Sequence, residues 1–120
     1  MNACFRSDLI VYDMVYKEGK NLVSDERSVE MAKSISLNDW KAERSSGSFS
    51  TYSAVDNETG LILRLYKESH ADGRENYGLS VYKMQSYANG ERQEKCVGGA
   101  LNSDYAHRLF QAVDLNCVRR

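Results

Sequence analysis

The chain has 120 residues, which is enough for one domain with a modest core and too short for two. Its 16 Lys and Arg residues nearly balance its 17 Asp and Glu residues, and the formal net charge of −1 gives no overall field to attract nucleic acid or an anionic membrane. No apolar run approaches the ~20 residues that a membrane span needs. Three cysteines without a CxxC spacing favour reduced thiols over a disulfide framework, so we expect one cytoplasmic domain over residues 1–120.

The first part of the chain predicts a strand followed by helical turns. Residues 9–17 are rich in Val, Ile, Leu and Tyr, as strands are. After them, Ser24 or Asp25 can cap a helix with a broad apolar face. That face consists of Val29, Met31, Ala32 and Ile35. The odd-numbered apolar positions also fit a strand, which stays open as the alternative, although charged residues on the opposite side favour the helix.

A second short helix is expected directly after the first. The sequence SLND over residues 36–39 resembles a capping box with Asp in the usual Glu or Gln place. This helix would carry Leu37, Trp40 and Arg44 and would end at the Ser and Gly residues of 45–48.

From Phe49 onward the pattern is that of strands separated by turns. Loops at 56–60 and 69–76 and the hairpin dipeptide Asn89-Gly90 divide residues 49–101 into a four-stranded antiparallel meander. A slip of one residue would turn every side chain to the opposite face, so the aliphatic residues define the register. The expected pairs are Leu63 with Val81, Leu65 with Leu79, Val81 with Gly98, and Lys83 with Cys96.

The end of the chain predicts a helix that begins at Ser103 or Asp104. Its apolar side consists of Tyr105, Ala106, Leu109, Phe110, Val113 and Cys117. The expected core face of the last strand is small, with Cys96, Gly98 and Ala100, and leaves room for this helix. The predicted fold is therefore α+β, with a sheet of four or five antiparallel strands, a C-terminal helix on one face and a short helical segment after the first strand.

No catalytic or metal-binding set emerges from the residue spacing. Asp104 and His107 lie three residues apart on a predicted helix, but a solvated helix face explains them better than an ion site. Cys117 and His107 fall on opposite helix faces, so no thiolate-activating pair forms there. The Gly98-Gly99 pair lacks the lysine and the spacing of a phosphate-binding loop. We therefore predict no catalytic residues, no metal site, no cofactor and no enzymatic activity.

The two faces of the predicted meander differ in chemistry. One is aliphatic and needs a core, whereas the other carries aromatic, Arg and Met side chains, which are enriched at protein interfaces. The candidate partner-binding residues are Tyr52, Arg64, Tyr66, Tyr82 and Met84. Tyrosine is also a good strand former, so a purely structural role, or cover by the first strand and the helices, remains an equal alternative.

The sequence thus predicts a small non-enzymatic protein that occludes a protein partner. Inhibitors of the anti-defence type, carried by phages or mobile elements, and toxin-immunity proteins are of this kind. A single-stranded nucleic-acid-binding module using the tyrosine and arginine face is the alternative, although five glutamates around the hairpins disfavour it. A small enzyme with an unrecognised site is the second alternative. No membrane association is expected, and homodimerisation is left open.

Overall fold

The structure, a computed structural model, describes residues 23–119. The expected strand at residues 9–17 lies outside the described residues. The elements in chain order are α2 (Asp25–Lys33), the 3₁₀ turn η1 (Leu37–Asp39), β1 (Lys41–Ser46), β2 (Phe49–Val55), β3 (Ile62–Ser69), β4 (Glu75–Ser86), β5 (Arg92–Leu101) and α3 (Asp104–Arg119). The α+β class is confirmed.

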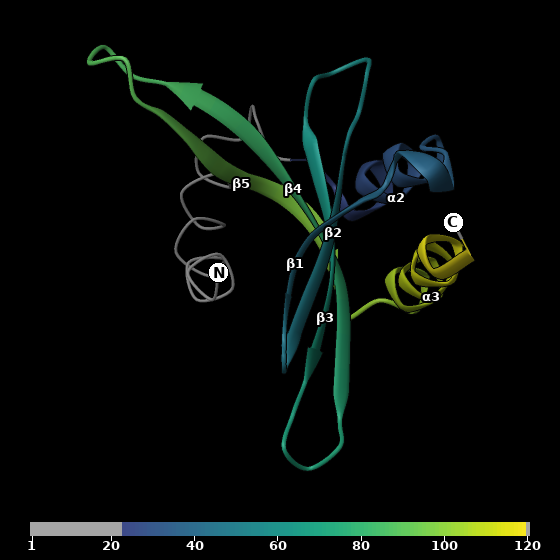
Figure 1. Ribbon diagram of the computed structural model, residues 1–120. Coiled ribbons are helices and arrows are strands. Elements are labelled where there is room, and N and C mark those ends of the chain that lie inside the picture. Colours follow the sequence, from purple (N-terminus) through teal and green to yellow (C-terminus); the bar gives the residue numbers. More distant parts are fainter. Residues whose placement is uncertain (1–22, 120) are drawn as a thin grey trace.

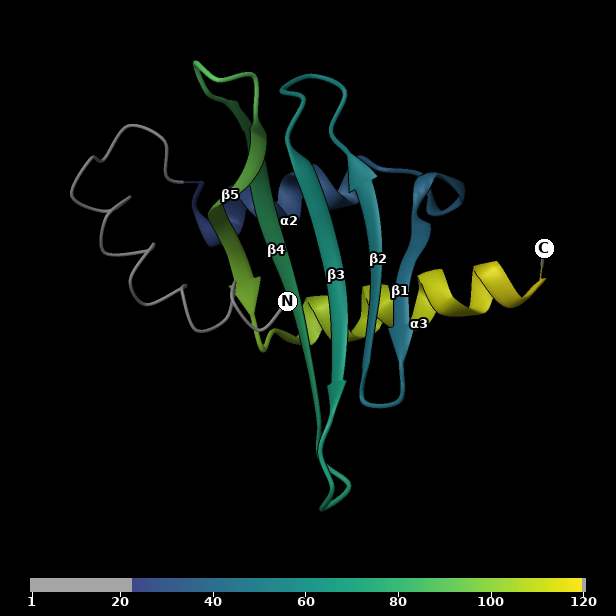
Figure 2. The ribbon, with the colours of Figure 1, turned by 60° about the vertical axis from the view of Figure 1, so that its left-hand side comes forward.

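The five strands form one antiparallel sheet in the order β1-β2-β3-β4-β5, so each strand lies beside its neighbour in sequence. Figures 1 and 2 show α2 and α3 on the same side of this sheet. We call that side the inner face and the opposite side the outer face. The buried hydrophobic residues of the sheet and of both helices form one cluster between these layers.

The helix predicted after residue 24 is confirmed as α2. The Ser24 hydroxyl accepts a hydrogen bond from the backbone N–H of Arg27, which satisfies one of the free donors of the first turn. Met31 and Ala32 are buried against the sheet, and α2 contacts β5. The alternative strand reading of this stretch is wrong.

The second predicted helix is reduced to one 3₁₀ turn, and the prediction that it reaches Arg44 is wrong. Ser36 caps η1 as expected, but Trp40 already has an extended backbone and is 0 % exposed. The next residues form β1, whose side chains are all exposed. These residues provide no apolar stripe for a helix to bury, whereas pairing with β2 satisfies their backbone groups.

The register of the two central strands is confirmed. Leu63 lies opposite Val81 and Leu65 lies opposite Leu79, and all four side chains are 0 % exposed. These residues form the aliphatic centre of the inner face. Because alternate residues of a strand point to opposite sides, their neighbours in sequence lie on the outer face.

The register of β5 is confirmed at one position and wrong at another. Val81 does lie opposite Gly98, but Lys83 lies opposite Lys95, because a bulge near Val97 adds one residue to β5. As a result Val97, which is 2 % exposed, lies in the core. Cys96 pairs with Tyr82 and lies outside the core. The prediction of Cys96 as a core residue is therefore wrong.

The C-terminal helix has the predicted start and the predicted apolar side. The Ser103 hydroxyl accepts a hydrogen bond from the backbone N–H of Ala106 at 3.0 Å. Phe110 packs edge-on against the rings of Tyr52 and Tyr77, and Val113 is fully buried. The position of α3 differs from the expectation, because it contacts β3, β4 and η1.

The space beside the small residues of β5 is taken by other parts of the chain. α2 contacts β5, and Val23 lies directly beside Gly98. The Val23 N–H donates to the Val97 carbonyl oxygen at 2.8 Å, and a Cβ at Gly98 would collide with the Val23 carbonyl oxygen. Gly98 is therefore required for this close backbone approach.

We expect Leu63→Ala to lower the free energy of unfolding by about 2–5 kcal/mol, the usual cost of emptying a buried leucine site. Leu115→Ala is the matched control, because Leu115 is 52 % exposed on α3, and it should change that free energy by less than about 0.5 kcal/mol. Denaturant unfolding followed by circular dichroism measures both values. Equal effects of the two substitutions would mean that the aliphatic centre of the inner face is not the core of the domain.

Candidate functional site

Arg64 lies on the middle strand of the sheet and projects from the outer face, where two carboxylates hold it. Its Nε donates to Glu43 Oε1 at 2.5 Å and its Nη1 donates to Glu94 Oε1 at 2.5 Å. Its Nη2 donates to Oε2 of both residues, at 3.1 Å for Glu43 and 2.8 Å for Glu94. Glu43 comes from β1 and Glu94 from β5, so this Arg64 clamp connects both edge strands to the centre of the sheet.

The clamp shifts the pKa values of Arg64 and Glu94. Only 14 % of the Arg64 side chain is exposed, so its attraction to the carboxylates is less screened than at an open surface. The hydrogen bond to Glu94 raises the pKa of Arg64, with Glu43 adding to the effect, and the same bond lowers the pKa of Glu94. Arg64 is thus a permanent cation whose donors are engaged within the chain.

Tyr66 and Tyr82 lie on the outer face, as predicted, but they are not accessible. Each is only 5 % exposed, so the prediction of open tyrosines is wrong. The Arg64 guanidinium lies 4.7 Å from the centre of the Tyr82 ring, which is a cation–π contact. Tyr66 stacks with Phe49 and lies over Gly78, where any Cβ would collide with its ring.

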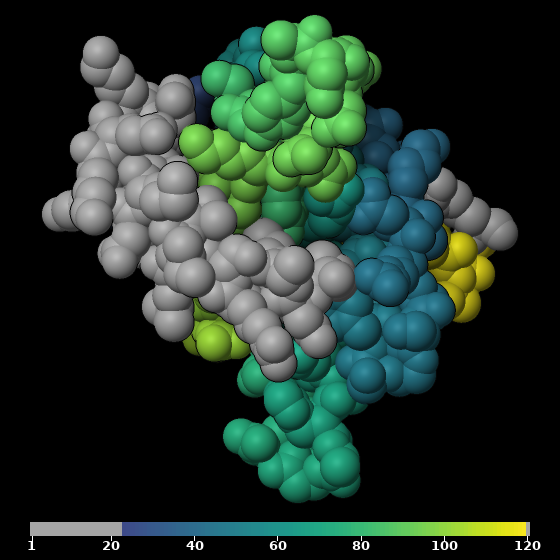
Figure 3. All heavy atoms as spheres, turned by 90° about the vertical axis from the view of Figure 1, so that its left-hand side faces the viewer, coloured from purple at the N-terminus to yellow at the C-terminus, as the bar shows by residue number. Residues whose placement is uncertain are grey.

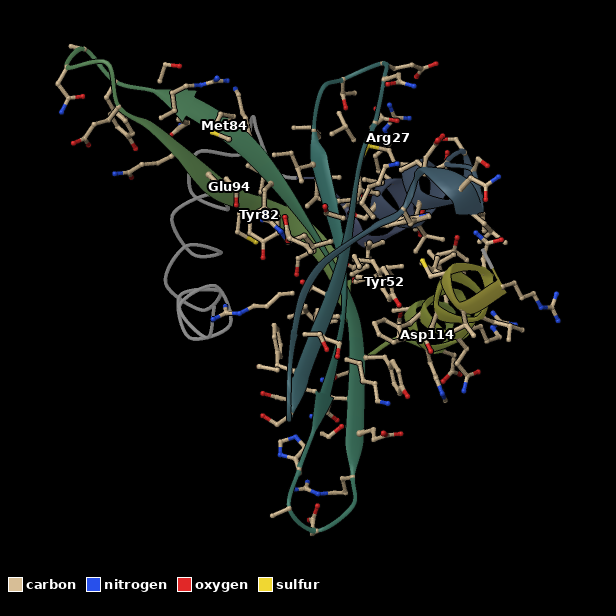
Figure 4. The ribbon with its side chains drawn as sticks, viewed as in Figure 1. Arg27, Tyr52, Tyr82, Met84, Glu94 and Asp114 are labelled. Carbon is tan, nitrogen blue, oxygen red and sulfur yellow. The ribbon has the colours of Figure 1, made fainter. Side chains whose placement is uncertain are left out.

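Tyr52 lies on the inner face, which corrects its assignment to the partner-binding set. It pairs with Leu65 across β2 and β3, so it shares the aliphatic face. Its hydroxyl donates to Asp114 Oδ1 of α3 at 2.6 Å, and Figure 4 shows both residues between the sheet and α3, away from Tyr82 and Glu94. Burial, with Asp114 nearby, raises the pKa of Tyr52. Tyr52 therefore joins the sheet to α3.

The β4–β5 hairpin projects from one end of the sheet, and the β3–β4 hairpin projects from the opposite end (Figures 1 and 2). We call residues 83–95 the arm. Figures 1 and 2 show it continuing past both helices, and Figure 3 shows its tip, in bright green, at the top of the molecule. Met84 is 36 % exposed and Tyr87 is 47 % exposed, so two large apolar side chains lie in water on this arm.

The hairpin predicted at Asn89-Gly90 is confirmed, but its turn consists of residues 88–90 rather than of this dipeptide alone, because Tyr87 pairs with Glu91. Gly90 has φ +88°, a conformation that favours glycine, and the Asn89 side-chain oxygen accepts from the N–H of Glu91 at 3.0 Å. Tyr87 precedes this turn, and its N–H donates to the carbonyl oxygen of Glu91 at 2.8 Å. Sequence reasoning missed Tyr87, although its place beside the strongest hairpin signal marks it as a residue of an exposed tip.

A pocket of about 410 Å³ lies between α2 and the β2–β3 loop, near Arg27 in Figure 4. Arg27 shares its lining with four carboxylates, those of Glu30, Asp39, Asp56 and Glu58. Asp56 has a structural role there, because its Oδ2 accepts from both the N–H and the hydroxyl of Thr59 and closes the loop. Within residues 23–119, no group of three or more His, Cys, Asp or Glu side chains could hold a metal ion.

The other residues weighed for chemistry have structural positions. His107 stacks on Tyr77 with ring centres 4.1 Å apart. Gly99 has φ +149°, and a Cβ there would collide with the carbonyl oxygen of Leu79, so the Gly98-Gly99 pair serves close packing of β5. These contacts give His107 and the Gly98-Gly99 pair structural roles that need no bound ligand.

Comparison of the chain with protein-family models, curated proteins and solved structures finds no match. No helix in residues 23–119 is long and apolar enough to cross a membrane. The geometry of the arm and of the outer face is therefore the basis for a functional proposal.

We expect Arg64→Met to lower the free energy of unfolding by about 1–3 kcal/mol, because it leaves two carboxylates without their cation while keeping apolar contact with Tyr82. Arg74→Met is the control. Arg74 pairs with Asp72 at the surface, where the two side chains are 72 % and 56 % exposed, and its loss should cost less than about 0.5 kcal/mol. Urea unfolding at low ionic strength distinguishes the two. Similar losses would mean that the clamp is an ordinary surface ion pair.

The clamp should also make stability depend on pH. The pKa of Glu94 is lowered in the folded state, so its contribution is complete above the unfolded value of about 4.3 and is lost as the pH falls through the folded pKa. Wild type should therefore exceed Glu94→Gln in stability most at neutral pH, and this difference should shrink below about pH 4. In an Arg64→Met background the difference should be nearly constant with pH. A constant difference in the wild-type background would contradict the ion pair.

Proposed function

We propose that this chain is a non-enzymatic protein-binding module that occludes a protein partner with its arm. The observation that carries the proposal is the exposure of Met84 and Tyr87 on a hairpin that extends past both helices. A hairpin of this kind gains little stability from being longer than the sheet needs. Met84 and Tyr87 lie three residues apart on the same hairpin, and the proposed role of the partner is to remove both from water.

The chemistry of the arm suits a protein surface. Methionine adapts its shape to irregular apolar grooves, and tyrosine combines a large contact area with a hydroxyl that tolerates water in the free protein. Glu94 lies opposite Met84 on the paired strand, and with Lys83 and Arg92 of the same hairpin it can form the polar rim of an interface. The expected partner site is a shallow apolar groove bordered by charges of both signs.

The nucleic-acid alternative receives less support. Base stacking needs accessible rings, whereas Tyr66 and Tyr82 are each 5 % exposed. Arg64, the central cation of that face, donates to Glu43 and Glu94, whose negative charges would oppose a phosphate. A cytoplasmic partner is proposed from the reduced-thiol composition, and an anti-defence or toxin-immunity role remains our hypothesis for the partner's class.

Affinity capture with three versions of the full chain tests the proposal. The wild type, the double variant Met84→Ala with Tyr87→Ala, and the control Leu115→Ala serve as bait in a lysate of the source cell. We expect one protein to be retained near one-to-one by the wild type and the control, and at least tenfold less by the double variant, since hot-spot side chains contribute about 1–4 kcal/mol each. Mass spectrometry quantifies bound protein, and absorbance with nuclease treatment quantifies bound nucleic acid.

Two outcomes would contradict this proposal. Equal capture of the same protein by the double variant would mean that the arm is not the contact surface. Co-purification of nucleic acid in place of a stoichiometric protein would mean that the class of partner is wrong. Thermal unfolding of each bait confirms that the variants are folded before capture.

A further inference from the structure

The pocket between α2 and the β2–β3 loop combines apolar and acidic side chains. Its apolar part consists of Met31 and Ile35 of α2 and of Val55 of β2, which is 53 % exposed. We call the carboxylates of Glu30, Asp39, Asp56 and Glu58 the acidic lining. The volume of about 410 Å³ is within the range of sites that hold small organic groups. Apolar surface beside negative charge suits a cation carried on an aliphatic chain.

Asp56 gives a second and independent indication of a ligand. It lines the pocket and is only 5 % exposed. Its Oδ2 accepts both hydrogen bonds from Thr59, whereas its Oδ1 accepts none within residues 23–119. Oδ1 is not fully enclosed, so a donor can reach it. A buried carboxylate oxygen costs free energy unless a donor or a cation pairs with it, and a bound cation would supply that partner.

The cations of the described chain do not neutralise the acidic lining. Over residues 23–119, none of its four carboxylates forms an ion pair, although Arg27 lies in the same pocket. In that part of the chain the carboxylates are not grouped as ligands of one metal ion either. Charge complementarity therefore favours an organic cation as the occupant.

The hydrogen bonds of Asp56 favour an ammonium over a guanidinium. A guanidinium binds best when both oxygens of one carboxylate accept from it, and Oδ2 of Asp56 is already engaged by Thr59. An ammonium is a compact charge whose donors rotate, so it can use Oδ1 together with carboxylates on other elements. Lysine carries such an ammonium on a flexible aliphatic stem that suits the apolar part of the pocket.

The pocket lies at the same end of the sheet as the tip of the arm. Alternate hairpins of an antiparallel meander turn at the same end, so the β2–β3 loop and the β4–β5 turn share one end. Figure 2 shows both at the top of the sheet. One protein surface can therefore reach the arm and the pocket together.

We propose that this pocket binds a lysine side chain of the protein partner. The stem lies against Met31, Ile35 and Val55, and the ammonium donates to Oδ1 of Asp56 among the other carboxylates of the acidic lining. The source of the lysine rests on the proposed function, whereas binding of an alkylammonium by the pocket does not depend on it.

Nuclear magnetic resonance of the isotope-labelled full chain tests the pocket without any partner. The probe is Nα-acetyl-lysine N-methylamide, and the uncharged control is the norleucine analogue. We expect saturable shifts of backbone amides in residues 27–39 and 55–58 with the lysine probe, a weaker response with the arginine analogue and none with norleucine. Shifts spread over the whole surface, or equal responses to lysine and norleucine, would overturn the proposal.

Two exposed residues of the acidic lining allow charge to be removed without touching the Asp56 loop. Asp39→Asn and Glu58→Gln should each weaken binding of the lysine probe about threefold, the usual effect of one exposed charge. Glu26→Gln is the matched control, because Glu26 is an exposed carboxylate of α2 outside the pocket, and it should leave the affinity unchanged. Equal weakening by all three substitutions would mean that only the overall charge matters and would contradict the site.

Asp56 and Arg27 should act in opposite directions. Asp56→Asn keeps an oxygen that can accept from Thr59 but removes the charge, so it should weaken the lysine probe about tenfold. Arg27→Gln removes a competing cation and should strengthen the probe about threefold. Circular dichroism checks that both variants are folded. Lower stability of Arg27→Gln with unchanged probe binding would mean that Arg27 itself fills the pocket, and would overturn the proposal.

Affinity capture decides the source of the ammonium. The double variant Asp39→Asn with Glu58→Gln keeps the arm intact and should retain the partner of the wild type at least about threefold less. Undiminished capture, with a normal response of the wild type to the lysine probe, would overturn the partner's lysine as the source and indicate a free polyamine, which titration with spermidine checks. A wild type that captures no protein would contradict the proposed function, while the probe titration still decides whether the pocket binds an alkylammonium.

Discussion

The burial of one aliphatic stripe across β3 and β4 is the constraint on which the rest of the structure depends. Leu63, Leu65, Leu79 and Val81 offer water no hydrogen bonds and are fully buried. Their alternation with polar and aromatic residues determines the strand register. It also explains why α2 and α3 both lie on the inner face, because that face carries the aliphatic surface that their apolar sides cover.

The second consequence of this stripe is that the outer face must be stabilised by other means. There the chain uses pairings between strands: Arg64 with two carboxylates, Arg64 over Tyr82, and Tyr66 over Gly78. A face with such internal pairings has fewer free groups for a ligand than its composition suggests. On the arm, which lies beyond both helices, Met84 and Tyr87 remain in water, as Leu115 does on α3.

The elements with strong local signals could be predicted from the sequence. Ser24 and Ser103 mark helix starts, Asn89-Gly90 marks a hairpin, and the period-two leucines define the central pairing. Features that depend on distant contacts could not be predicted. β1 forms because β2 is available as its partner, the bulge at Val97 places that residue in the core, and Tyr52 takes the inner face through the register of β2 and β3. The contact of Tyr82 with Arg64, and of Arg64 with Glu43 and Glu94, likewise joins residues far apart in the sequence.

The Arg64 clamp has a consequence for how the chain folds. Arg64 is 21 residues from Glu43 and 30 from Glu94 in sequence, and the two glutamates come from opposite edges of the sheet. Neighbouring hairpins can form from local contacts alone, but this interaction needs all five strands in register at once. The clamp therefore contributes only after the last edge strand has joined, which makes the native sheet more cooperative than its sequential topology would suggest and resists the loss of either edge strand alone.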